Sequence, residues 1–213
     1  EASDRYGVKL LGGDTCRAKG LMTVSITIMG TCKAGCSVKR SGARAGDKIC
    51  VSGTLGNSAA GLSLLQEGQR KTPGEKRLIK GHLEPVARVD LVQALSAMPG
   101  VGALMDLSDG LAADLPHILE ASGPSLGAVI DVAKIPLSKD LRAVCAEHGW
   151  DVLSPALEGG EDYELLFTCR PDAPLESLVQ AGLPDITVIG EITPDAEIQW
   201  QGTNRAFHGF RHF

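Results

Sequence analysis

The five residues Asp106-Leu107-Ser108-Asp109-Gly110 join an apolar run, Val101 to Met105, to a pattern typical of a helix. A strand that ends in acidic side chains just before a helix places carboxylates at the edge of a sheet, where Mg²⁺ and phosphate groups are commonly bound. An ordinary N-cap of the helix that follows is the alternative, but a cap accounts for one polar residue and not for three. The motif therefore favours a metal-dependent phosphate site in a chain that contains both strands and helices.

Strand-like and helix-like patterns alternate from residue 48 onward. Leu111, Leu115, Ile118 and Leu119 recur at helical spacing, whereas residues 128–132 form a short apolar run typical of a strand. The same criteria predict further strands at 48–52, 103–106, 164–169, 186–192 and 197–201, and further helices at 59–66, 75–82, 88–97, 139–147 and 175–181. We therefore predict an α/β or α+β fold.

The first 30 residues differ in pattern from the rest. Residues 1–6 predict the end of a helix, with Gly7 as its C-cap. Residues 9–11 and 21–29 predict strands, and the second of these alternates strictly between apolar and hydroxyl side chains. We interpret residues 1–30 as the remnant of an N-terminal ATP- and metal-binding domain, and residues 31–213 as a C-terminal α/β domain.

The overall charge and the cysteines limit the class of protein. Lys plus Arg number 21 and Asp plus Glu number 26, so the net charge of -5 argues against a nucleic-acid partner. No run approaches the roughly 20 apolar residues of a membrane span. The six cysteines are irregularly spaced, which favours reduced thiols and a cytoplasmic location over a disulfide framework.

Two further acidic turns flanked by glycine resemble the first motif in composition. Gly12-Gly13-Asp14-Thr15 lies between two predicted strands, and it suits either a hairpin turn or the backbone of a phosphate site with Asp14 as a metal ligand. Gly159 to Glu164 carries three acids in four residues, which suits either a solvated surface turn or an anchor for a cationic substrate. Arg40 is a candidate phosphate ligand because its guanidinium binds two oxygens at once, although most single arginines are simply solvated.

Five segments occur in the order seen in one enzyme family. They are GGDTCR, KRSGARAGDKICVSGTLGNSAAGL, MDLSDGLAADLPHI, GGEDYELLFT and the terminal GFRHF. Together they resemble thiamine-monophosphate kinase, a member of the aminoimidazole ribonucleotide synthetase-like ATP-binding superfamily. Asn57 departs from the pattern, since the family commonly has an aspartate there. The resemblance covers essentially the whole chain, and GGEDYELLFT combined with DLSDGL is its most specific part.

The resemblance implies a fold, a reaction and a set of ligands. The fold would be the C-terminal α/β sandwich domain of that superfamily, preceded by the last strands of an incomplete N-terminal domain. The reaction would be ATP-dependent phosphorylation of thiamine monophosphate to thiamine diphosphate, by direct transfer with several Mg²⁺ ions, in a homodimer. No side chain would act covalently. The residues that match the family's binding positions are Gly13, Asp14, Arg40 and Ser108 for the nucleotide, Asp14, Asp106 and Asp109 for metal, and Glu161 and Phe210 for the substrate.

Other readings stay open at this point. The family has most of an N-terminal domain before the position that matches Glu1, so we expect little or no kinase activity from these 213 residues alone. Another ATP-using member of the superfamily, such as the hydrogenase-maturation carbamoyl dehydratase, shares the looser features. A non-catalytic binding module that retains the motifs is a third possibility.

Overall fold

The computed structural model describes residues 2–17, 19–68, 72–183 and 185–209, and it divides into two compact units, Glu1–Ser37 and Val38–Phe213. The first unit contains one short helix, α1 (Ala2–Tyr6), and Gly7 follows it with a φ of 64°. The amide of Val8 donates to the carbonyl of Ser3 at 3.0 Å, which closes the helix. The helix predicted at the start of the chain is thus present.

The strands predicted at 9–11 and 21–29 do not form, and this part of the expected fold is wrong. Neither segment belongs to a ladder among the described residues, and their apolar side chains lie in solvent: Leu21 is 92% exposed and Ile26 is 80% exposed. Alternation of apolar and polar residues decides which face of a strand is buried, but a strand also needs a neighbour for its N–H and C=O groups. The described part of this unit supplies none.

The second unit is built on one six-stranded sheet. Its strands are β1 (Lys48–Ser52), β2 (Val101–Asp106), β3 (Gly127–Asp131), β4 (Leu165–Cys169), β5 (Ile186–Thr193) and β6 (Ile198–Gln201). The spatial order is β2-β4-β1-β5-β3-β6, and all pairs are antiparallel except β3 with β6. Such a mixed sheet with helices confirms the predicted α/β class, in its α+β form.

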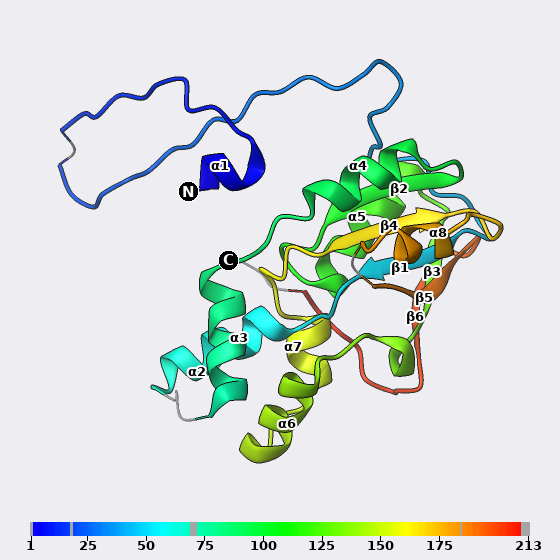
Figure 1. The fold of residues 1–213 in the computed structure, drawn as a ribbon. Coiled ribbons are helices and arrows are strands. Elements are labelled where there is room, and N and C mark those ends of the chain that lie inside the picture. The colour runs from blue at the N-terminus through cyan, green and yellow to red at the C-terminus, as the bar shows by residue number, and fades with distance from the viewer. Residues whose placement is uncertain (1, 18, 69–71, 184, 210–213) are drawn as a thin grey trace. The chain divides into compact units, whose positions relative to one another are not determined.

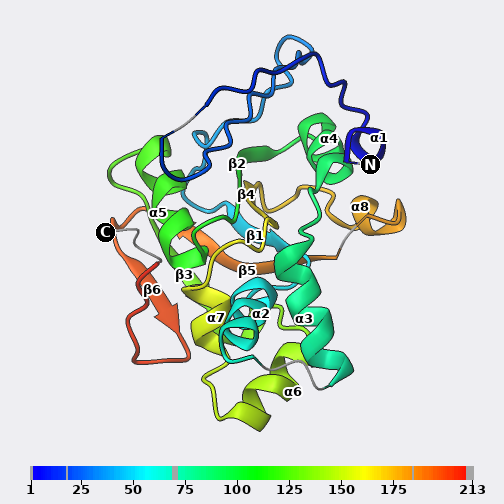
Figure 2. The same cartoon turned by 90° about the vertical axis from the view of Figure 1, so that its left-hand side faces the viewer.

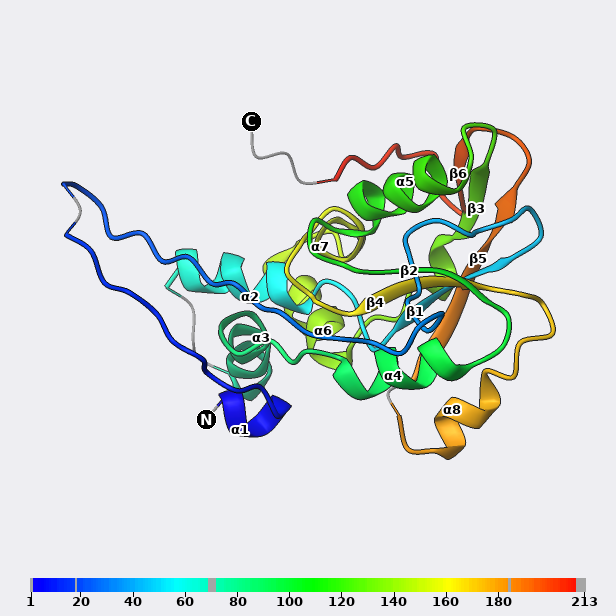
Figure 3. The same cartoon turned by 90° about the horizontal axis from the view of Figure 1, so that it is seen from above.

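Helices cover both faces of the sheet, as Figure 3 shows. On one face, α5 (Leu111–Ser122) packs on alternate residues of the strands, such as Ile49 and Val51 of β1. On the other face, α4 (Val89–Ala97) and α8 (Glu176–Gln180) pack on the residues between, such as Cys50. Burial of both faces explains why β4 is apolar along most of its length and fully buried.

A helical cluster extends from one end of the sheet (Figures 1 and 2). It contains α2 (Asn57–Gln66), α3 (Pro73–Leu83) and α6 (Lys139–His148), with α7 (Leu153–Leu157) beside α2. Thr72 begins α3 with a capping box, because its hydroxyl accepts from the amide of Glu75 and the Glu75 carboxylate accepts from the amide of Thr72. A short 3₁₀ helix, η1 (Val132–Lys134), follows β3. None of the described helices is long and apolar enough to cross a membrane.

Candidate active site

Two of the acidic motifs meet at the end of the β2–β4 ladder. Asp106 pairs with Leu165, and beyond this pair the two segments of the chain continue side by side. The amide of Leu107 donates to the carbonyl of Glu164 at 2.8 Å, and that of Tyr163 donates to the carbonyl of Leu107 at 2.9 Å. The amide of Glu161 then donates to the carbonyl of Ser108 at 2.8 Å. Residues 106–110 and 159–164, the two site loops, therefore form one continuous backbone platform.

Glycines allow this close approach of the two site loops. A Cβ atom at Gly160 would overlap the carbonyl oxygen of Ser108, and one at Gly110 would lie 2.8 Å from the carbonyl oxygen of Gly159. Gly110 also has a φ of 97°, which side chains rarely permit. A Cβ at Gly159 would in turn overlap Ala59 of α2. The glycine doublet thus serves packing between the site loops and α2.

The first site loop is held by Asp114, a residue that our sequence reasoning missed. The amides of Ser108 and Asp109 both donate to the Asp114 carboxylate at 3.0 Å. Burial raises the pKa of Asp114, and the nearby charges of Asp109 and Asp106 raise it further. The N-cap residue of α5 is Gly110, and no side chain caps the helix there, so the N-cap interpretation of Ser108 or Asp109 is wrong.

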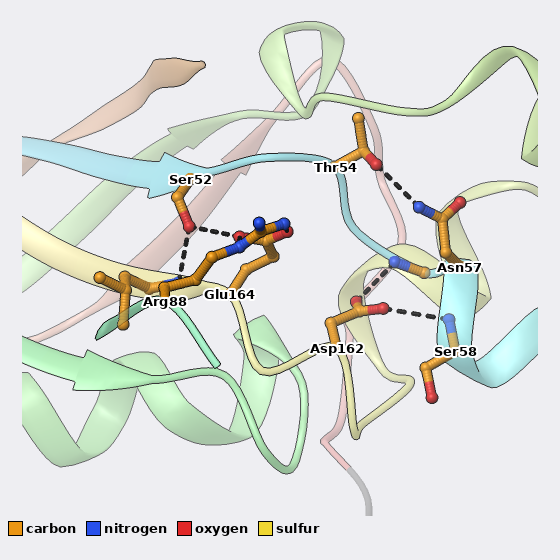
Figure 4. Close-up of polar contacts among 9 residues, drawn as sticks. Ser52, Thr54, Asn57, Ser58, Arg88, Asp162 and Glu164 are labelled. Carbon is orange, nitrogen blue, oxygen red and sulfur yellow. Dashed lines mark hydrogen bonds and ion pairs between the residues drawn. The ribbon is translucent and has the colours of Figure 1, made fainter. Parts of the chain in front are cut away.

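The three acids of the second site loop have three different environments, so a simple solvated turn is ruled out. Glu161 faces solvent, with 54% of its side chain exposed. Asp162 accepts from the amides of Gly56 at 2.6 Å and Ser58 at 3.1 Å, and it thereby caps the start of α2 (Figure 4). Its burial raises its pKa to about 7, although these amide hydrogen bonds act in the opposite direction.

The third acid, Glu164, is buried and paired. Ser52 donates to its Oε2 atom at 2.5 Å, and the guanidinium of Arg88 binds both carboxylate oxygens, with Nε at 2.8 Å from Oε2 (Figure 4). The amide of Leu165 donates to the Ser52 hydroxyl at 2.8 Å. This network joins β1, β4 and the start of α4, and it fixes the C-terminal end of the second site loop, where the loop enters β4.

The site loops border an open pocket of about 560 Å³. Ser108 and Asp109 line it from the first loop, and Glu161 and Tyr163 line it from the second. Glu161 and Tyr163 have φ values of 63° and 50°, and they are the non-glycine residues of the described chain with positive φ. Such backbone conformations cost free energy and tend to collect at functional sites. The remaining wall comes from α2 and α3 and includes Ala59, Leu62 and His82.

The donor set at the first site loop suits Mg²⁺ bound together with phosphate. Asp106 is exposed, Asp109 is half-buried, and their negative charge is strong enough to raise the pKa of Asp114. No group of three or more His, Cys, Asp or Glu side chains forms a ready-made metal site among the residues that the structure describes. Mg²⁺ typically takes one or two protein carboxylates and completes its shell with phosphate oxygens and water, so two aspartates are sufficient.

Of the other predicted site residues, Arg40 is in the same unit as this pocket but does not line it. Gly13 and Asp14 belong to the first unit, where Asp14 accepts from the amide of Thr15 at 2.8 Å. Without flanking strands, this turn is not a hairpin. Arg40 has an exposed side chain, and its carbonyl lies 3.4 Å from the hydroxyl of Ser122 at the C-terminal end of α5. Its backbone is thus about a helix length, roughly 18 Å, from the start of α5. Phe210 lies outside the described residues.

These features define a class of protein. Residues 44–201 match the family "AIR synthase related protein, C-terminal domain", so the chain belongs to this family. The curated thiamine-monophosphate kinase of Aquifex aeolicus is 36% identical over 213 residues, which are 100% of this chain and 65% of that protein. The solved structure "AaThiL complexed with AMPPCP and TMP" has a TM-score of 0.72 at 40% identity, covering 83% of this chain and 54% of that chain.

A further solved structure shows how widely the fold is shared. Escherichia coli HypE, a hydrogenase maturation protein, has a TM-score of 0.59 at 24% identity, covering 82% of this chain and 52% of that one. This likeness extends to the fold alone. The chain spans about two thirds of the length of the Aquifex aeolicus kinase and about half of the matched solved chains.

Proposed function

We propose that the natural full-length protein transfers the γ-phosphoryl group of ATP to thiamine monophosphate and releases thiamine diphosphate. The observation that carries this proposal is the pocket in which a loop rich in metal-binding oxygens, represented by Asp109, and a carboxylate suited to a cation, Glu161, line one space. The curated relatives carry the name of that reaction. The reaction requires positioning and charge compensation more than covalent chemistry from the protein.

The side chains divide this work between them. Asp106 and Asp109 would hold Mg²⁺, which when bound neutralises phosphate oxygens at the transferred group. Asp114 keeps the backbone of Ser108 and Asp109 in place. Glu161 faces the pocket with a carboxylate that attracts the thiazolium cation of the substrate. The apolar side chains of Ala59 and Leu62 offer the substrate's ring system a wall to pack on.

The contributions of other residues are part of the same proposal. Gly13, Asp14 and Arg40 would contact the nucleotide or its metal, and Phe210 would contact the substrate. We further propose that residues 31–213 act as the C-terminal domain beside an N-terminal domain that ends at residue 30. The active form would be a Mg²⁺-dependent homodimer in the cytoplasm.

An assay of product formation tests the proposal. The natural full-length protein is incubated with ATP, Mg²⁺ and thiamine monophosphate, and ADP and thiamine diphosphate are quantified beside a reaction without the monophosphate. We expect ADP release that depends on thiamine monophosphate. For Asp106→Asn we expect kcat to fall by at least about a hundredfold, because the Mg²⁺ ion that neutralises the transferred phosphate then loses a carboxylate ligand. A folded protein that binds ATP without forming thiamine diphosphate would refute the kinase and favour a binding module.

A further inference from the structure

His82 is a pocket residue with no role in the account so far. It lies in the last turn of α3, and its Nδ1 atom lies 2.9 Å from Oγ of Ser58 and 3.3 Å from Oε2 of Glu161. Only 15% of the His82 side chain is exposed, whereas the Glu161 side chain is 54% exposed. A largely buried imidazole therefore lies against an exposed carboxylate at the pocket wall.

The position of His82 is fixed by packing between α2 and α3. A Cβ atom at Gly61 would lie 2.7 Å from the carbonyl carbon of Leu78, so the two helix backbones touch at this point. His82 follows Leu78 by one helical turn and projects from the same side of α3. Ser58 is fixed in turn, because its amide donates to the Asp162 carboxylate at 3.1 Å.

The backbone of Glu161 is also fixed, and this leaves its side chain as the variable part. Its amide is bonded to Ser108, and its φ of 63° is held by the contact between the two site loops. The rotatable bonds of a Glu side chain still let an exposed carboxylate sample many positions. The contact of its Oε2 atom with Nδ1 of the largely buried imidazole, at 3.3 Å, favours one of them.

We infer that His82 is a positioning residue that sets the preference of the pocket for a cationic ring, through the 3.3 Å contact between its Nδ1 atom and the Glu161 carboxylate. This inference rests on the proposed function and adds to it the source of substrate selectivity. Removing the imidazole leaves the Glu161 charge in place but releases its position. The expected loss is about tenfold in affinity for the cationic substrate, the order of magnitude of one polar contact to a charged group that is partly exposed. Nucleotide affinity is unaffected.

The test compares His82→Ala with three other variants of the natural full-length protein. His82→Asn keeps a donor near the position of Nδ1, Ser58→Ala removes the hydroxyl that supports the imidazole, and His117→Ala alters an exposed histidine on α5 as a matched control. Steady-state kinetics give kcat and separate KM values for thiamine monophosphate and ATP. Inhibition constants are measured for thiamine monophosphate analogues whose thiazolium is replaced by a neutral thiophene ring.

For His82→Ala we expect KM for thiamine monophosphate to rise about tenfold with KM for ATP within twofold, and the preference for the cation over the neutral analogue to fall by a similar factor. His82→Asn recovers most of this loss, Ser58→Ala lowers the preference for the cation about threefold, and His117→Ala matches the wild type.

The inference is overturned if selectivity is unchanged in His82→Ala and Ser58→Ala. It is also overturned if both KM values rise together with a fall in melting temperature. If His82→Ala does not fold, Ser58→Ala decides the matter: a loss of selectivity supports the inference, and unchanged selectivity overturns it. A wild-type protein that forms no thiamine diphosphate refutes the proposed function itself and removes the basis of the inference.

Discussion

The substitution Gly160→Ala probes the contact between the two site loops. The new methyl group would overlap the carbonyl oxygen of Ser108 and lie 3.2 Å from Cα of Asp109. These are backbone atoms of a loop that Asp114 holds by two hydrogen bonds, so the loop has little room to give way. The two loops must therefore separate, and the bond from the amide of Glu161 to the carbonyl of Ser108 is then lost or lengthened.

Two contributions set the size of the effect. Overpacking of a closely packed site costs about 1–3 kcal/mol, and loss of one backbone hydrogen bond costs about 1 kcal/mol. We expect the free energy of unfolding to fall by about 2–4 kcal/mol, measured by urea denaturation monitored by circular dichroism. The matched control is Gly81→Ala in α3, where no atom lies within 4 Å of the added methyl group. There the gain in helix propensity should stabilise the protein by about 0.5–1 kcal/mol. If Gly160→Ala is as stable as Gly81→Ala, the loops are not in contact as described and the reasoning fails.

Three further predictions concern the supports of the site. Arg88→Met leaves the buried Glu164 carboxylate without its cation and should lower the free energy of unfolding by about 3 kcal/mol in urea, while adding Glu164→Met should recover much of this loss; equal stability of wild type and single variant would contradict the pairing. The pKa of Asp162 in the folded protein, about 7, lies above its ordinary value of 3.8, so the folded state retains a proton that the unfolded state loses, and stability from this group is full below pH 4 and is lost as the pH rises toward 7. Urea titrations should therefore show a fall in stability between pH 4 and pH 7, by at most about 4 kcal/mol, that is absent in Asp162→Asn; an identical slope in the variant would sink this assignment. Thr72→Ala should remove the capping box of α3 and cost about 1 kcal/mol in the same assay, and no change would show that the cap is dispensable.

Local pattern was sufficient for most of the second unit. Each strand and each helix predicted there occurs within a few residues of its expected bounds, because burial on one or both faces leaves a periodic mark in the sequence. The helix α7 was missed because its five residues, Leu153–Leu157, include a proline and are too short to show a period. The strand expected at 21–29 failed for the opposite reason, since a clear period does not supply a partner strand.

The site was predictable in its motifs and unpredictable in its connections. The spacing of Asp106, Ser108 and Asp109 marked the first site loop, and the glycine doublet at residue 159 marked the second. The supporting residues act across long stretches of chain: 76 positions separate Arg88 from Glu164, and 106 separate Gly56 from Asp162. Periodicity carries no information on such pairs. Only the pair Asp109 and Asp114 was close enough in sequence to be predicted locally. A carboxylate in the first turn of a helix, five residues after Asp109, can accept from the amides of the loop that precedes the helix.

A crystal structure of the natural full-length protein with a non-hydrolysable ATP analogue, Mg²⁺ and thiamine monophosphate tests the central claim most directly. That claim is that the two site loops form one site for metal, nucleotide and substrate. We predict Mg²⁺ within coordination distance of Asp106 and Asp109, about 2.1 Å, and the thiazolium ring in the pocket beside Glu161. Ligands bound elsewhere, with this pocket filled by solvent, would contradict the account.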